Sequence, residues 1–414
     1  MIEFSQKIKT IQNSLHHYEI DGWLFFDCYN RDPIAQKVLG LDPKRYATRR
    51  WCYLIPSKGV PTKLVHSIEK EHLEELPGKT ILYSSWIDLH TKLTDMLRGS
   101  KRLAMQYSPC NDIPRISYID AGLLELIKSF NIEVVSSANL IQLFVAKLSD
   151  ENIALHKQAG EKIQLIKDRV FKFIFTAVKN GARITEYEAQ QFILREFVKE
   201  NLTSEGLDPI VAVNSHAANP HFQVTPTNTY EIKKEDRILV DLWAKMNVPN
   251  GVYYDITWCG YVGKTPPNNY LQLFDTVVQA RNLTKNFVIK KIMNKERVFG
   301  YEVDDVCRNY ISQKGYGQYF THRTGHSIDT SLHGSGVNID NFETRDYREL
   351  MPGLCFSIEP GIYKDALGVR SEINVLITYD NTCLLVGPEQ KKLVLLDDYS
   401  NLEINTNEDL RLKR

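Results

Sequence analysis

The sequence predicts two domains: an α/β domain over residues 1–148, followed by an α+β domain over residues 149–414. A length of 414 residues suits two domains of ~100–200 residues each. Strand and helix patterns alternate up to residue 145, which is typical of an α/β layer. After residue 205 strand patterns dominate, which favours helices packed on one face of a largely antiparallel sheet.

Hydrophobic spacing places the elements of the first domain. Apolar residues at helical spacing predict helices over residues 4–15, 86–97 and 121–130. Short apolar runs predict strands over residues 22–26, 50–55, 64–66, 102–107 and 132–135.

A long helix is expected to open the second domain. Ser149 or Asp150 can cap its first turn, and apolar periodicity continues to Ile174 before Gly181 breaks it. Thr185 begins a second helix. Strands are then expected over 210–213, 237–246, 252–262, 355–359, 369–378 and 384–386, with helices over 270–293 and 303–315. The charged stretch 409–414 is expected to be frayed.

Composition excludes several classes of protein. Lys plus Arg and Asp plus Glu both number 51, so no net charge attracts nucleic acid or an anionic membrane. No apolar run approaches the ~20 residues that a bilayer span needs, and the N-terminus lacks the pattern of a signal peptide. The seven cysteines form no CxxC pair, which indicates reduced thiols. We therefore expect a cytoplasmic protein.

Acidic residues stand inside apolar strand patterns, where they are costly unless paired or bound to metal. Asp241 and Asp255 lie in two predicted strands joined by a turn signal at residues 247–251. A hairpin would place these two carboxylates side by side. His326, Glu359 and Glu372 follow in the same domain, and alternation puts Arg370, Glu372 and Asn374 on one face of the last of these strands.

These four carboxylates and one imidazole have the chemistry of a metal site. Like charges in a dry site need a counter-charge, and two divalent cations balance four carboxylates. Bridging carboxylates hold such ions ~3.5–4 Å apart, a spacing suited to activating a water. An oxygen-rich set favours Mn²⁺, Co²⁺, Fe²⁺ or Zn²⁺ over copper. A lone Asp in a strand is more often a turn or edge residue, and a lone His a core or surface group, so the inference depends on the joint pattern.

Four short segments carry a resemblance to a known family: Asp-Ile-Thr at 255–257, Thr-Gly-His at 324–326, Ile-Glu-Pro-Gly-Ile-Tyr at 358–363 and Gly-Val-Arg-Ser-Glu at 368–372. Together with Asp241 they resemble the metallopeptidases aminopeptidase P, prolidase and methionine aminopeptidase. The resemblance covers essentially the whole chain. Residues 1–148 resemble the creatinase-type N-terminal domain, and residues 149–414 resemble the pita-bread catalytic domain.

The resemblance implies a role for each ligand. Asp241 would chelate one metal ion, and Asp255 and Glu372 would bridge both. His326 and Glu359 would complete the second, with Glu359 also a candidate proton carrier. Mn²⁺ is the first expectation for both ions, with Co²⁺, Fe²⁺ and Zn²⁺ as alternatives.

Further residues take roles by the same resemblance. His221 matches a histidine near the substrate amide, and His333 matches one that steadies the tetrahedral intermediate. The plain alternatives are a surface histidine beside a turn and a histidine bonded to the backbone. Arg370 is expected to pair with a ligand carboxylate, whereas His216 and His322 are interpreted as structural, surface or peripheral.

The implied activity is that of an Xaa-Pro aminopeptidase. A water bridging two metal ions would attack the scissile carbonyl, one ion would act as Lewis acid, and a carboxylate would pass the proton to the leaving nitrogen. The substrate would be a peptide with proline at its second position, and the enzyme a homodimer. The first alternative is an Xaa-Pro dipeptidase (prolidase), because the sequence does not show whether the N-terminal domain closes the far end of the site.

Two other functions use the same fold. Creatinase hydrolyses a small non-peptide substrate without metal, and relatives among histone chaperones are non-catalytic binding modules; retention of all five ligands argues against both. The chain also departs from the family pattern. Ser327-Ile328-Asp329-Thr330 follows His326 where glycines are usual, and Trp258-Cys259 follows Thr257 where Arg-Thr is common. These departures remove no ligand but leave the shape of the substrate pocket open.

Overall fold

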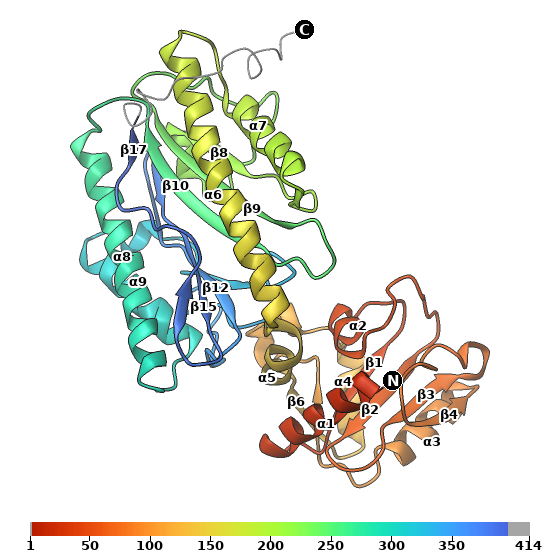
Figure 1. The fold of residues 1–414 in the computed structure, drawn as a ribbon. Helices are drawn as coiled ribbons and strands as arrows, with labels where there is room; N and C mark the ends of the chain where they lie inside the picture. Colours follow the sequence, from red (N-terminus) through yellow and green to blue (C-terminus); the bar gives the residue numbers. More distant parts are fainter. Residues whose placement is uncertain (1, 396–414) are drawn as a thin grey trace. The chain divides into compact units, whose positions relative to one another are not determined.

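A computed structural model describes residues 2–395, and the chain divides into two compact units, residues 1–147 and 148–414 (Figure 1). The C-terminal stretch 409–414, expected to be frayed, lies outside the described residues. Within residues 2–395, none of the helices combines the length and hydropathy that crossing a bilayer requires.

The first unit is a mixed sheet with helices on both faces. Its strands run in the order β4-β3-β2-β1-β5-β6. Alternation along β1 explains the layers, because Trp23 and Phe25 pack against α1 and α2 whereas Leu24 packs against α3 and α4. The elements are α1 (Ile2–His17), β1 (Gly22–Asp27), α2 (Pro33–Leu39), β2 (Trp51–Pro56), β3 (Thr62–His66), β4 (Lys79–Tyr83), α3 (Trp86–Met96), β5 (Arg102–Met105), α4 (Ala121–Ser129), β6 (Glu133–Ser136) and α5 (Ala138–Ile141).

The second unit combines antiparallel strand pairs with long helices. Its strands form the orders β17-β10-β9-β7, with β8 also paired to β9, and β11-β12-β15-β16, besides a ribbon of β13 and β14. The elements are α6 (Asp150–Lys179), α7 (Glu186–Lys199), β7 (Leu202–Thr203), β8 (Ile210–Val213), the 3₁₀-helix η5 (Asn214–Ala218), β9 (Arg237–Met246), β10 (Tyr254–Tyr261), α8 (Asn268–Met293), α9 (Gly300–Gln313), β11 (Ser327–Ile328), β12 (Cys355–Ile358), β13 (Gly361–Lys364), β14 (Leu367–Arg370), β15 (Ile373–Ile377), β16 (Cys383–Leu385) and β17 (Val394–Leu395).

Strand β9 separates two layers of the second unit. Val240 and Leu242 pack against α6 and α7, which lie along the sheet in Figure 1. On the opposite face, Leu239 belongs to a second core cluster that includes residues of β14, α8 and α9. This face of β9 and β10 contacts β14 and β15, and α8 packs on β12, β13 and β14. Asp241 shares the face of Leu239, so the acidic residues lie on the side away from α6.

Helix α6 is fixed to the residue before β10 by a buried histidine. The helix begins with a capping box, in which Ser149 Oγ accepts from the Asn152 N–H. One turn later, the His156 Nδ1–H donates to the Tyr253 carbonyl at 2.6 Å, and its Nε2 lies 3.7 Å from the Cys355 Sγ. A carbonyl only accepts, so the ring is the neutral tautomer with its proton on Nδ1.

This histidine predicts a loss of stability in acid. Burial lowers the pKa of His156 from 6.5 to about 4. Between these values the unfolded chain binds a proton that the folded chain rejects, so stability falls as pH falls through that window. We expect wild type to lose about 3 kcal/mol relative to His156→Asn between pH 7 and pH 4. Urea unfolding of both proteins across this range measures the difference, and parallel pH profiles would contradict it.

Candidate metal centre

The β9–β10 hairpin brings two carboxylates onto one face. In its register, Asp241 lies opposite Thr257 and Asp255 lies opposite Trp243. The two aspartates are thus diagonal neighbours, and both are buried. The hairpin expected from the sequence forms, with the longer loop implied by the spacing of the two aspartates.

Asp255, His326 and Glu372 form the core of the site. Each offers one ligand atom, and these atoms lie within 4.8 Å of one another with all three side chains buried. The Asp255 Oδ2 lies 3.6 Å from the His326 Nε2. Glu359 adds its Oε1 at 3.3 Å from the same nitrogen. Four of the five expected ligands therefore converge on one point, although they come from separate parts of the chain.

The protonation of His326 indicates what belongs at that point. Its Nδ1–H donates to the Ser327 carbonyl at 3.1 Å, which leaves the Nε2 with a lone pair. Burial lowers the pKa of His326, so the ring is neutral. A lone pair then faces two carboxylates, an arrangement that is repulsive without a cation between them.

The carboxylates point to the same conclusion. Burial, followed by the neighbouring charge of Asp241, raises the pKa of Asp255 well above its usual range. Burial and the charge of Asp255 do the same to the pKa of Glu372. Among the described residues, the buried Asp255 Oδ1 and Glu372 Oε1 have no hydrogen-bond partner. Unpartnered carboxyl oxygens beside an imidazole lone pair fit divalent cations, which would favour the ionised carboxylates and bind the free oxygens.

Thr257 links Asp241 to this core. Its hydroxyl lies 2.7 Å from the Asp241 Oδ1 and 3.0 Å from the Glu372 Oε2, and it accepts from the Arg370 Nε at 3.0 Å. The single hydroxyl proton can serve only one of the two carboxylates. Asp241 and Glu359 are not members of the three-residue core, and the Asp241 Oδ2 pairs with the Arg370 guanidinium.

The segment from residue 369 to 378 is not the single strand that the sequence predicted. Arg370 ends β14, which pairs with β13, whereas β15 begins at Ile373 in another sheet. Glu372 lies in the break between them. The side chains still converge, since Asn374 binds the backbone of Asp255 from the far side of the break. The change of sheet, rather than alternation along one strand, brings Arg370 and Glu372 into the site.

The loop before β9 carries His221. His221 is exposed, and its backbone N–H donates to the Asn219 Oδ1 at 3.1 Å. Arg370 holds this loop, because its Nη1 donates to the Pro220 carbonyl at 3.3 Å. Gly368 allows the approach: a Cβ there would lie 1.6 Å from the Ala217 carbonyl oxygen. The β14 backbone therefore places the His221 loop beside Arg370.

His333 is also exposed, and it lies against the core. Its ring centroid is 4.4 Å from that of His326, edge to face. Both histidines expected near the substrate are thus solvent-accessible, and the ring of His333 lies against that of the expected ligand His326. His216 matches its structural interpretation, since its Nδ1 lies 2.8 Å from the buried Glu186 Oε2 and its ring stacks on Tyr230.

His322, which was interpreted like His216 as structural, surface or peripheral, belongs to a hydrogen-bonded chain that reaches the site. The Arg370 Nη1 donates to the Tyr363 hydroxyl at 2.8 Å, and that hydroxyl donates to the His322 Nε2 at 2.9 Å. Burial, with Arg370 acting in the same direction, lowers the pKa of His322 to about 3.

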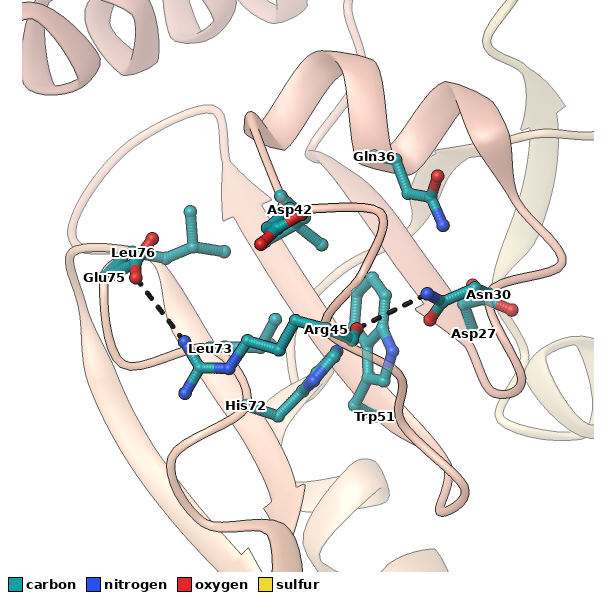
Figure 2. A pocket seen from close by; sticks show the side chains of 11 residues that line it. Asp27, Asn30, Gln36, Asp42, Arg45, Trp51, His72, Leu73, Glu75 and Leu76 are labelled. Carbon is teal, nitrogen blue, oxygen red and sulfur yellow. Dashed lines mark hydrogen bonds and ion pairs between the residues drawn. The ribbon is translucent and has the colours of Figure 1, made fainter.

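A cavity in the first unit offers no comparable chemistry. Figure 2 shows its lining, where Trp51 and His72 lie 5.6 Å apart between ring centroids. The Trp51 Nε1 and the His72 Nε2 have no hydrogen-bond partner among the described residues. The cavity measures about 20 Å³, enough for one or two water molecules that would bond both nitrogens. Its buried carboxylate, Asp27, is satisfied by backbone N–H groups.

Comparisons with known proteins agree with this geometry. The model of metallopeptidase family M24 matches residues 158–379, more than half of the chain. An uncharacterized peptidase of Staphylococcus epidermidis is 27% identical over 406 residues, which cover 93% of this chain and 99% of that protein.

Solved structures share the fold over nearly the whole chain. The dipeptidase PepE of Mycobacterium ulcerans has a TM-score of 0.70 at 21% identity, covering 95% of this chain and 98% of that one. An X-prolyl aminopeptidase of Caenorhabditis elegans, described as a cytosolic enzyme with a di-nuclear active site, has a TM-score of 0.63 at 15% identity, covering 94% of this chain and 63% of that one. With the family match extending over α6 to β15, the chain belongs to metallopeptidase family M24 and is a peptidase of the pita-bread fold.

Proposed function

We propose that this peptidase is a dinuclear-metal aminopeptidase that hydrolyses the N-terminal Xaa-Pro bond of peptides. The observation that carries the proposal is the core of Asp255, His326 and Glu372, in which buried carboxylate oxygens and an imidazole lone pair face one another unpartnered. Glu359 and Asp241 bring the set to four carboxylates, which two divalent cations balance. The di-nuclear site of the Caenorhabditis elegans neighbour supports this stoichiometry.

Each residue would have a defined role. Asp255 and Glu372 would hold both ions, Asp241 the first, and His326 and Glu359 the second. When bound, the ions would lower the pKa of a water and polarise the scissile carbonyl. Glu359 would take up the proton and return it to the leaving nitrogen. His333 and His221, which are exposed at the site, would bind the substrate around the scissile amide.

The second candidate is a dipeptidase acting on Xaa-Pro alone. The similarity to the dipeptidase PepE favours it, and the same metal centre would serve both activities. The two functions differ in whether a residue is accepted beyond proline. We further expect the enzyme to be cytoplasmic and homodimeric. Light scattering tests the oligomeric state, and we expect twice the monomer mass.

The deciding experiment compares an Xaa-Pro dipeptide with an Xaa-Pro-Xaa tripeptide. Wild type, Asp255→Ala and Asp275→Ala would be stripped of metal and refilled with Mn²⁺. The exposed Asp275 on α8 serves as the matched control. Metal-dependent cleavage of the tripeptide that is lost only in Asp255→Ala supports the aminopeptidase. Cleavage of the dipeptide alone identifies a dipeptidase. Two bound ions without either cleavage indicate another N-terminal preference, and a protein that binds no metal overturns the proposal.

A further inference from the structure

The loop from Ser327 to Ser335 carries His333 and follows directly from the expected ligand His326. The His333 side chain is exposed, and its ring lies 4.4 Å from the ring of His326. What orders the backbone of this loop therefore contributes to where the His333 imidazole lies relative to the metal centre.

One buried carboxylate accepts hydrogen bonds from the loop on both sides of His333. The Asp329 Oδ1 accepts from the Ser331 N–H at 2.7 Å, and its Oδ2 accepts from the Ser335 N–H at 2.8 Å. These donors stand two residues before and two residues after His333. The Asp329 side chain is 1% exposed, so both bonds are shielded from water and charge-assisted. No shorter side chain at this position could reach both N–H groups.

Other hydrogen bonds link this loop to the β9–β10 hairpin. The Tyr253 N–H donates to the Asp329 carbonyl at 3.1 Å, two residues before Asp255. The Lys245 Nζ donates to the Thr330 carbonyl at 2.8 Å. Gly334 completes the packing, because a Cβ there would lie 2.9 Å from the Asp329 Oδ2.

The far side of the loop is held as well. The buried Arg348, paired with Asp346, donates to the Ser335 carbonyl at 2.8 Å. The Gly334 N–H donates to the Ser327 carbonyl at 2.7 Å. The backbone on both sides of His333 is thus bonded, and Asp329 is the side chain that joins the two sides.

We propose that Asp329 is the positioning residue of His333, setting its imidazole against the metal centre through the Ser331 and Ser335 N–H groups. The inference rests on the proposed function, since it concerns the same site.

The test is Asp329→Asn, which keeps the size of the side chain but directs an NH₂ group at one of the two N–H donors. We expect kcat for Xaa-Pro-Xaa to fall about 10- to 100-fold with KM within about twofold, because positioning errors act on the reacting geometry. Metal content should not change. In the His333→Ala background, Asp329→Asn should cause no further loss of kcat, because its effect passes through His333.

Two readouts do not depend on activity. Hydrogen exchange in the peptide spanning residues 329–336 should accelerate in Asp329→Asn, and carbethoxylation of His333, followed by mass spectrometry, should become faster. Gly334→Ala, which crowds the same carboxylate, should reproduce both changes. These measurements keep the proposal testable if wild type cleaves no Xaa-Pro bond, an outcome that would overturn only the proposed function.

Asp340→Asn is the matched control. Asp340 is equally buried and accepts from the N–H groups of Phe342 and Glu343, both at 2.9 Å, but does not bracket His333. The Asp340→Asn variant should loosen the turn that follows residue 340 and leave kcat within about twofold of wild type. Equal losses of kcat in both variants, a loss that persists without His333, or unchanged exchange and carbethoxylation in Asp329→Asn would each overturn the proposal.

Discussion

Asp255→Asn is expected to abolish tight metal binding and to lower Xaa-Pro hydrolysis on the order of 10³-fold, because Lewis-acid stabilisation is worth several kcal/mol. The asparagine keeps the shape of the side chain but removes the charge that would bind both ions. Metal analysis after dialysis against Mn²⁺ and the tripeptide assay measure the two effects. A variant that retained two ions and full activity would contradict the assignment of Asp255.

The same substitution should stabilise the protein when metal is absent. Burial and the charge of Asp241 disfavour the ionised form of Asp255, and its Oδ1 has no partner among the described residues. Removing the charge relieves that penalty, and we expect a gain of about 1–2 kcal/mol in the free energy of unfolding. Adding Mn²⁺ should then raise the melting temperature of wild type but not that of Asp255→Asn.

A second buried aspartate provides the control for the predicted gain in stability. Asp304 is fully buried like Asp255, but it pairs with Arg308 at 2.9 Å and accepts from the Thr324 N–H at 2.9 Å. Asp304→Asn should therefore destabilise the protein with or without metal. Thermal unfolding of both variants in chelator distinguishes the two cases. A metal-free Asp255→Asn that melts below wild type would show that the centre is not built to receive cations.

The common face of two expected ligands, Asp241 and Asp255, could be predicted because each stands in a pattern with a known period. Asp241 and Asp255 lie in strands whose alternation fixes their common face, and the turn signal between them predicts the hairpin. The segments around His326 and Glu359 are recognisable by their residue types. These features are local, so a sequence can carry them.

The features that could not be predicted depend on distant parts of the chain. Periodicity cannot show that the backbone changes sheets between Arg370 and Glu372, because both halves look like one strand. Nor can it show that His322 and Tyr363, 41 residues apart, are hydrogen-bonded. In the first unit, β4 was missed because most of it is exposed or half-buried and lacks a clear apolar alternation.

Arg370 is expected to show the largest effect on stability. Its guanidinium bonds Asp241, Thr257 and the Tyr363 hydroxyl, and it is 4% exposed. Arg370→Ala would leave the Asp241 carboxylate buried without its cation, which costs about 3–5 kcal/mol. Arg370→Lys should recover only part of this loss, because an ammonium cannot bridge several acceptors in one plane. Urea unfolding in chelator measures both variants.

A second substitution distinguishes the cost of the unpaired Asp241 charge from the loss of Arg370 packing. If the penalty comes from the unpaired charge, Asp241→Asn in the Arg370→Ala background should restore most of the stability, and the two substitutions should be far from additive. Bound Mn²⁺ should also narrow the gap between wild type and Arg370→Ala, since a cation beside Asp241 replaces part of the lost positive charge. An additive double variant, or a gap that Mn²⁺ leaves unchanged, would mean that Arg370 acts by packing alone and that Asp241 does not bind metal. The Arg370 variants thus test whether Asp241 has a dual role. In the metal-free protein Asp241 would pair with Arg370, and in the metal-loaded protein it would also bind a cation.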